Sequence, residues 1–157
     1  MFPQALSAGS PTVALLDVSV LVALSWPLHS LNAPALQWFA AHAASGWATC
    51  PLTEAGFVRV SAQPATGLAN SVQHALQVLE KNCASPGHVF WPLDNPLGGI
   101  LAEIRERLAG AQQLSDALLL DLAVRRGGKL VTLDQRIASL LPADSRHRDA
   151  IEIIAVE

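Results

Sequence analysis

The chain has 157 residues, of which 51% are apolar and 15% are charged. This composition favours one domain with a sizeable core and excludes an intrinsically disordered protein. The formal net charge of −3 argues against a simple electrostatic binder of nucleic acid, although it leaves room for an enzyme whose carboxylates bind metal beside such a substrate.

Several features of the sequence bear on the compartment. No apolar run reaches about 18 residues without Pro, Gly or polar breaks, so no membrane span and no membrane partner are expected. Residues 1–12 lack the basic region of a signal peptide, and we expect them to be a flexible tail before a single domain at 13–157. Two cysteines are too few for a disulfide framework, and Cys50 is expected to be a small core residue. The cytoplasm is therefore the expected compartment.

Strand-like and helix-like segments alternate in the first half of the sequence. The continuous apolar run at residues 13–16 predicts a strand that is buried on both faces. Residues 18–25 predict a helix that Pro27 ends, and a second helix is expected from its N-cap Asn32 to Gly46. The next predicted elements are a strand at 47–50, a helix at 51–62, a helix around 68–79 and a strand at 88–91.

The second half of the sequence continues this alternation. A turn-rich loop that contains Asp94 precedes a predicted helix at residues 98–111. Ser115 is expected to cap a helix at 116–126, which a pair of glycines ends. The last predicted elements are a strand at 129–133, a short helix at 135–141 and a strand at 151–156. Strands that alternate with helices indicate an α/β protein with a mostly parallel sheet that is covered on both faces.

Four acidic residues follow strands or begin helices in this predicted topology. Asp17 and Asp134 each follow a strand directly, and ligands of open parallel sheets bind outside the carboxyl ends of the strands. Glu54 comes four residues after the strand that ends at Cys50, and Asp116 begins the helix that precedes the strand leading to Asp134. We expect these acids to converge if the strands before Asp17 and Asp134 are neighbours.

Each acid also has a structural interpretation when it is considered alone. Asp17 and Asp134 fit the N-cap of the following helix, and Asp116 in a first helical turn complements the helix dipole. Glu54 lies among apolar neighbours and would need a partner, such as an ion pair with Arg59. The combination carries more weight, because neighbouring carboxylates repel one another until a cation binds them. Mg²⁺ or Mn²⁺ prefers such oxygen ligands and supports the hydrolysis of phosphodiester bonds.

Other polar residues are weaker candidates. Asp121 is expected to face away from Asp116, because five positions correspond to about 140° on an ideal helix. The histidines show no paired ligand spacing, so no zinc site is expected. Ser19 and Thr132 lie two residues from an aspartate, and each either orients a carboxylate or bonds its own backbone. The basic residues that flank the acidic segments are Arg59, Arg125, Arg126, Lys129 and Arg136. Each either positions a phosphate of the substrate or faces solvent, and solvent exposure is favoured for Arg125 and Arg126.

Three segments carry the candidate acids: "LLDVSVLVAL", "CPLTEAGFVRV" and "LSDALLLDLAVRRGGKLVTLDQRI". Together they resemble the PIN-domain ribonucleases, specifically the VapC-type toxins of bacterial toxin–antitoxin pairs. The resemblance covers nearly the whole chain from residue 13 onwards. Its most specific part is the last segment, where Asp116, the glycine pair at 127–128 and the "TLD" at 132–134 fall in the family's order and spacing.

This resemblance implies a three-layer α/β/α sandwich around a mostly parallel sheet. It implies a Mg²⁺- or Mn²⁺-dependent endoribonuclease that cleaves RNA and acts as the toxin of a type II toxin–antitoxin pair. By the same resemblance, Asp17, Glu54, Asp116 and Asp134 form the acidic group that binds metal and catalyses the reaction. A homodimer is also implied, as is a cognate antitoxin protein whose C-terminal segment wraps the toxin.

Two other functions stay open at the level of the sequence. A phosphatase of the haloacid dehalogenase type also places an aspartate after its first strand, but it usually carries a second aspartate two residues later, where this chain has Ser19. A non-catalytic α/β binding module would keep the helix caps and would need no metal.

Overall fold

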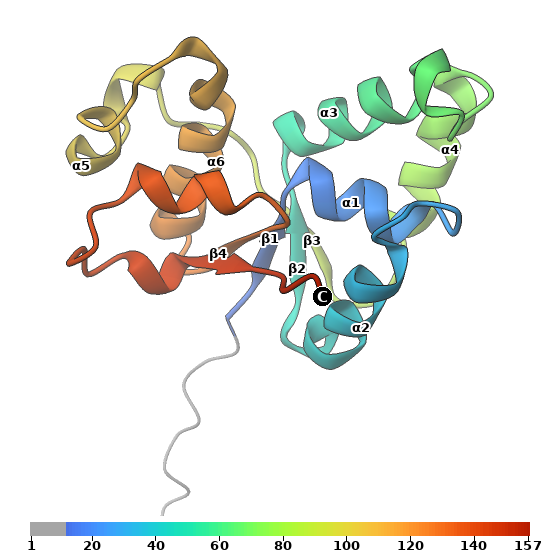
Figure 1. The fold of residues 1–157 in the computed structure, drawn as a ribbon, viewed down its shortest axis with the longest axis horizontal. Coiled ribbons are helices and arrows are strands. Elements are labelled where there is room, and N and C mark those ends of the chain that lie inside the picture. The colour runs from blue at the N-terminus through green and yellow to red at the C-terminus, as the bar shows by residue number, and fades with distance from the viewer. Residues whose placement is uncertain (1–11) are drawn as a thin grey trace, which may run out of the picture.

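The structure is a computed structural model and describes residues 12–157 (Figure 1). The expected tail at residues 1–12 falls almost entirely outside this range. The strands are β1 (Ala14–Leu16), β2 (Trp47–Thr49), β3 (His88–Phe90), β4 (Lys129–Thr132) and β5 (Ile151–Ile153). The α-helices are α1 (Val18–Ser25), α2 (Asn32–His42), α3 (Pro51–Ser61), α4 (Val72–Cys83), α5 (Ala102–Arg105) and α6 (Leu114–Arg125). Short 3₁₀ helices are η1 (Ala43–Ser45), η2 (Pro64–Thr66), η3 (Leu97–Gly99), η4 (Ala111–Gln113), η5 (Gln135–Leu140) and η6 (Arg148–Ala150).

The five strands form one sheet in the order β3-β2-β1-β4-β5, and every neighbouring pair is parallel. The prediction of a parallel α/β sheet is therefore confirmed. β1 lies at the centre of the sheet and pairs with β4, which comes more than a hundred residues later. The carboxyl ends of these two strands consequently meet at one edge, as the convergence of Asp17 and Asp134 requires.

Helices cover both faces of the sheet and give three layers, α/β/α (Figure 1). Successive side chains of β1 point to opposite faces of the sheet. Leu15 packs in the core on the face covered by α5 and α6, and Leu16 packs in the core on the face covered by α1, α2, α3 and α4. This alternation follows from the two-residue period of a strand, and it explains why β1 is apolar throughout. Within residues 12–157, no helix is both long enough and apolar enough to cross a membrane.

The close packing of α3 against α1 depends on a glycine. A Cβ atom added at Gly56 would lie 2.4 Å from Cγ2 of Val18, closer than two carbon atoms can approach. The absence of a side chain therefore lets the two helices pack together on this face of the sheet. Glu54 lies on the same helix, in its first turn, so this packing helps to place it.

The predicted helix at residues 98–111 is wrong, because only the short helix α5 lies within it, and the 3₁₀ helices η3 and η4 overlap its two ends. The reason is a long-range contact that local sequence does not encode. Asp121 is 2% exposed and accepts hydrogen bonds from the Leu101 backbone N–H at 2.9 Å and the Asn95 side-chain amide at 3.1 Å. These bonds hold the start of the segment as a loop over α6.

Two predicted N-caps are also wrong. Asn32 is the first residue of α2, and its side-chain amide donates to the carbonyl oxygen of Ala23 at 2.7 Å, near the end of α1. Ser115 lies inside α6, because Leu114 already begins the helix and Gln113 is its N-cap. An N-cap precedes the first residue of its helix, so α2 begins one residue earlier than predicted and α6 begins two residues earlier.

Candidate active site

Asp17 and Asp134 lie where the carboxyl ends of β1 and β4 meet. The backbone N–H of Asp17 donates to the carbonyl oxygen of Val131 at 3.0 Å, so Asp17 leaves the sheet directly beside β4. Asp134 comes two residues after the end of β4. The sheet register therefore places both aspartates at this edge.

Asp17 is 8% exposed and is surrounded by hydrogen-bond donors. Its Oδ1 accepts from the backbone N–H of Val18 at 2.7 Å, and its Oδ2 accepts from Thr132 Oγ1 at 2.7 Å and from Ser19 Oγ at 3.1 Å. Thr132 Oγ1 in turn accepts from the backbone N–H of Asp134 at 3.0 Å. Thr132 thus connects the two aspartates, and both hydroxyl groups that were weak candidates in the sequence orient Asp17.

Asp116 lies in the first turn of α6, near enough to Asp17 and Asp134 for their charges to act on its carboxylate. Burial, followed by the negative charges of Asp17 and Asp134, raises the pKa of Asp116 to about 6, while Arg136 acts in the opposite direction. Burial also raises the pKa of Asp17, against the hydrogen bonds that it accepts. Three of the four predicted acids therefore form a group, which we call the aspartate site (Asp17, Asp116 and Asp134).

Asp134 is the most exposed of the three aspartates and forms an ion pair with Arg136. It caps η5 by accepting from the backbone N–H of Arg136 at 2.9 Å, and its Oδ2 lies 2.8 Å from Arg136 Nη2. The hydrogen bonds of Arg136 lower the pKa of Asp134, so it is the carboxylate most readily ionised here. The guanidinium group of Arg136 is largely exposed to solvent.

Glu54, the fourth predicted acid, makes its contacts elsewhere. Its Oε1 accepts from Thr49 Oγ1 at 2.7 Å and lies 4.0 Å from Cys83 Sγ. Its charge acts on Cys83 and His88, whereas the charges that act on Asp116 are those of Asp17, Asp134 and Arg136. Among the described residues, no ion pair joins Glu54 to Arg59, the partner considered from the sequence. The participation of Glu54 in the aspartate site stays a prediction.

Glu54, Cys83 and His88 form a second group, which we call the Glu–Cys–His cluster. One ligand atom from each residue lies within 4.8 Å of the others, and all three side chains are half-buried. Burial, followed by the charge of Glu54, raises the pKa of the Cys83 thiol, and burial lowers the pKa of His88. The sequence pattern did not reveal this cluster, because its members come from α3, α4 and β3 and share no regular spacing.

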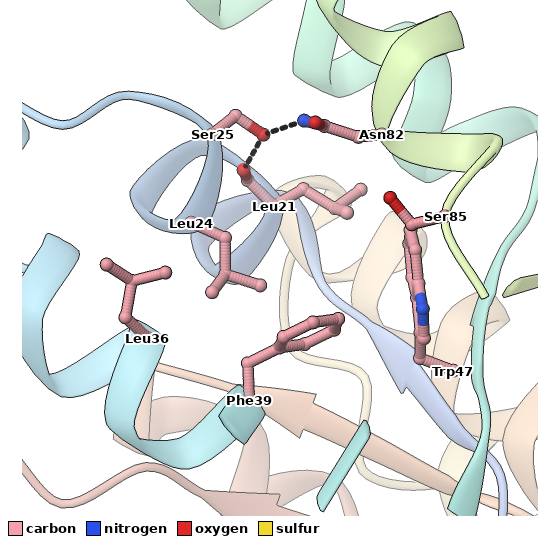
Figure 2. Close-up of a pocket in the computed structure, with 8 residues that line it drawn as sticks. All are labelled: Leu21, Leu24, Ser25, Leu36, Phe39, Trp47, Asn82 and Ser85. Carbon is pink, nitrogen blue, oxygen red and sulfur yellow. Dashed lines mark hydrogen bonds between the residues drawn. The ribbon is translucent and has the colours of Figure 1, made fainter. Parts of the chain in front are cut away.

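Two hollows lie near these groups and differ in character. An apolar pocket of about 120 Å³ opens between α1, α2 and α4, and Figure 2 shows its lining residues Leu21, Leu24, Ser25, Leu36, Phe39, Trp47, Asn82 and Ser85. Its polar groups partly satisfy one another, since the Asn82 amide donates to Ser25 Oγ at 2.8 Å (Figure 2). A second hollow of about 320 Å³ is lined by seven residues: Ala109, Gln112, Gln113, Asp116, Arg136, Ile137 and Leu140. The second hollow therefore adjoins the aspartate site.

The remaining charged candidates have structural partners or face solvent. Asp121 points into the loop at residues 95–101, away from the aspartate site as expected, and also accepts from Arg125 Nε at 2.8 Å. Arg125 and Arg126 are both exposed, as favoured from the sequence, and Arg125 also forms this ion pair with Asp121. Asp94 is exposed, and Cys50 is fully buried, which confirms its expected place in the core.

Comparison with known proteins identifies the family. The PIN domain family model matches residues 14–140. Ribonuclease VapC38 of Mycobacterium tuberculosis (strain ATCC 25618 / H37Rv) is 43% identical over 149 residues, which cover 92% of this chain and 99% of the relative. Ribonuclease VapC39 of Mycobacterium tuberculosis (strain CDC 1551 / Oshkosh) is 39% identical over 142 residues, which cover 90% of this chain and 99% of the relative.

Solved structures show the same fold. FitAB bound to an IR36 DNA fragment matches with a TM-score of 0.58 and 19% identity over 92% of this chain and 97% of that one. VapC20 of Mycobacterium tuberculosis, described as a toxin that cleaves the Sarcin-Ricin loop, has a TM-score of 0.57 and 12% identity over 80% and 93% of the two chains. VapBC2 from Rickettsia felis, bound to a promoter DNA fragment, has a TM-score of 0.54 and 13% identity over 82% and 96%. The chain therefore belongs to the PIN-domain family and, within it, to the VapC-type ribonucleases.

Proposed function

We propose that this protein is a metal-dependent endoribonuclease that acts in the cytoplasm as the toxin of a toxin–antitoxin pair. The observation that carries the proposal is the convergence of Asp17, Asp116 and Asp134 at the carboxyl edge of β1 and β4, where burial and the charges of Asp17 and Asp134 raise the pKa of Asp116. The ribonuclease names of the relatives that cover almost the whole chain support the same function.

The aspartate site has the donor set that a hard divalent cation requires. Its members offer carboxylate oxygens, which Mg²⁺ and Mn²⁺ prefer, and the raised pKa values of Asp17 and Asp116 show a cost that such a cation would offset. We infer that Asp17, Asp116 and Asp134 hold the metal and that Glu54 completes the set. At these residues an ion would supply a more acidic water for attack on phosphorus and would stabilise the leaving oxygen.

The residues of the chain have separate tasks in this proposal. Thr132 and Ser19 donate to Asp17 Oδ2 and fix the direction of its carboxylate. Arg136 extends its exposed guanidinium group beside the hollow of about 320 Å³, where it can bind a phosphate of the RNA. The net charge of −3 provides no general attraction for RNA, so we expect substrate binding to depend on this local patch and the metal.

The proposed partners are a cognate antitoxin and a second copy of the chain. The fold shared with the VapBC2 structure from Rickettsia felis and with FitAB supports an antitoxin partner. Large apolar side chains exposed around the start of α2, Leu28 at 96% and Leu36 at 48%, are consistent with a protein interface in this region. Light scattering of the purified protein, alone and with its antitoxin, measures both assemblies.

Replacement of Asp17 by Asn tests the nuclease proposal. We expect Asp17→Asn to abolish RNA cleavage and growth inhibition, because the neutral amide removes a metal ligand while it keeps the shape of the side chain. Asp94→Asn is the matched control, since Asp94 is an exposed loop carboxylate, and it is expected to retain activity. Full cleavage by Asp17→Asn, or undiminished wild-type cleavage in excess EDTA, would contradict the proposal.

The two alternatives considered from the sequence lack comparable support. In the position where a haloacid dehalogenase phosphatase usually has a second aspartate, Ser19 donates a hydrogen bond to Asp17. A binding module without chemistry does not account for three neighbouring carboxylates of which two, Asp17 and Asp116, have raised pKa values. The family assignment agrees with a nuclease instead.

A further inference from the structure

We propose that Glu54, Cys83 and His88 form a second metal site, which selects ions of the Zn²⁺ class over Mg²⁺. Glu54 comes from the first turn of α3, Cys83 is the last residue of α4, and His88 is the first residue of β3. The ligand atoms of these three residues lie within 4.8 Å of one another. The fold thus brings Glu54 to Cys83 and His88, which lie close together in the sequence but far from Glu54.

The chemistry of the three ligands determines which ion fits. A thiolate, an imidazole nitrogen and a carboxylate oxygen are the ligand types of zinc, whereas Mg²⁺ favours oxygen ligands alone. Three protein ligands leave a fourth tetrahedral position open for water. All three side chains are half-buried, so an ion can reach them from solvent.

The contacts around the Glu–Cys–His cluster hold its members in place. Thr49 Oγ1 donates to Glu54 Oε1 at 2.7 Å and lies 2.8 Å from His88 Nε2. A hydroxyl group has one proton, so His88 Nε2 must be the donor in the second bond. The ring of Trp47, whose centroid lies 4.6 Å from that of His88, packs against the imidazole. An ion on Nε2 would replace its proton and the hydrogen bond to Thr49, so the imidazole must rotate away from Thr49 Oγ1 to admit the ion, which would also replace the proton of the Cys83 thiol.

Occupation of this site would affect the aspartate site through Glu54. An ion bound to Cys83 and His88 would fix the Glu54 carboxylate beside Thr49, so it could not serve as the fourth acid with Asp17. Zn²⁺ is therefore expected to inhibit the Mg²⁺-dependent nuclease without competing for the three aspartates. This second step rests on the proposed function, whereas the binding of the ion does not.

Cobalt spectroscopy of the purified full-length protein tests the site itself. Co²⁺ takes the place of Zn²⁺ and gives a thiolate-to-cobalt absorption band only when a cysteine is a ligand. We expect the wild-type protein to show this band, Zn²⁺ to remove it and excess Mg²⁺ to leave it unchanged. Cys83→Ala and His88→Ala should weaken Co²⁺ binding by at least about 100-fold, since even the loss of an outer partner costs about 10–100-fold.

Matched controls separate the site from the other cysteine and from a histidine outside the cluster. Cys50→Ala removes the buried core thiol and His29→Gln removes a histidine on the loop after α1, and both should keep the band. If Cys83→Ala does not fold, Cys83→Ser replaces it. A wild-type protein without the band, or a Cys83 variant that retains it, would overturn the proposal.

RNA cleavage in saturating Mg²⁺ tests whether occupation of the Glu–Cys–His cluster inhibits the nuclease. The rate of each variant with Zn²⁺ is compared only with the rate of the same variant without Zn²⁺. We expect Zn²⁺ to inhibit the wild-type protein and Cys50→Ala but to leave the rate of Cys83→Ala unchanged. Equal inhibition of Cys83→Ala would overturn the proposed sharing of Glu54. Absence of wild-type cleavage without Zn²⁺ would instead contradict the nuclease proposal, and the cobalt result would still stand by itself.

Discussion

Asp17 combines two roles in one carboxylate. One oxygen caps α1 through the backbone N–H of Val18, while the other accepts from Thr132 and Ser19 at the aspartate site. The helix-cap and functional interpretations of the sequence were therefore not exclusive. Asp134 shows the same combination, because it caps η5 and also lies beside Asp17 through Thr132.

The raised pKa of Asp116 predicts a gain in stability when its charge is removed. Because the folded-state pKa of about 6 lies above the ordinary value of 3.8, the charged form destabilises the folded protein above about pH 6, and this cost disappears as the pH falls toward 4. We expect Asp116→Asn to unfold at a higher urea concentration than the wild type at about pH 8 in EDTA, with no such gain near pH 4.

Urea denaturation of both proteins at the two pH values, in the absence of divalent cations, measures this difference. Asp94→Asn is the control, since its carboxylate is exposed and lies in a loop. A gain in stability of the same size at both pH values would show that the cause is not the charge of Asp116.

At the scale of secondary structure, the sequence was most informative where apolar periodicity is strong. The residue bounds of α1 match the prediction, and all five predicted strands are present. The segment at 98–111 could not be predicted, because its loop depends on Asp121, which lies in another helix. The positions of the three acids of the aspartate site could be predicted, because two of them follow strands and one begins a helix. The position of Glu54 could not, because it depends on the direction of its side chain, which residue spacing does not reveal.

The contact between α1 and α3 predicts a cost for a side chain at Gly56. We expect Gly56→Ala to lower the free energy of unfolding by about 1–3 kcal/mol, because the new methyl group would overlap Val18 and force the helices apart. This loss should exceed the gain of roughly 0.5–1 kcal/mol that alanine brings inside a helix. Thermal and chemical denaturation measure the difference.

Gly98→Ala is the matched control for this substitution. A Cβ atom at Gly98 meets no other atom within 4 Å, and the backbone there has no positive φ angle. Gly98→Ala should therefore leave stability nearly unchanged. If Gly56→Ala is as stable as the wild type, the close approach of the two helices does not limit their packing.

At the scale of the whole molecule, Mg²⁺ should stabilise the fold, because the aspartate site joins β1, β4 and α6 only in the folded chain. A ligand that binds only the folded state adds about 2.7 kcal/mol when its concentration is a hundred times Kd. We expect Tm to rise with Mg²⁺ for the wild type and for Cys83→Ala. The same titration should leave the Tm of Asp17→Asn unchanged, and an equal rise in that variant would place the ion elsewhere.

The adjacency of β1 and β4 also decides when the site can exist during translation. The ribosome makes Asp17 more than a hundred residues before Asp134 and before β4, the strand that pairs with β1. A nascent polypeptide that has not yet reached Lys129 thus lacks both β4 and Asp134. Fragments released by a premature stop before Lys129 should accordingly be harmless to the cell that makes them.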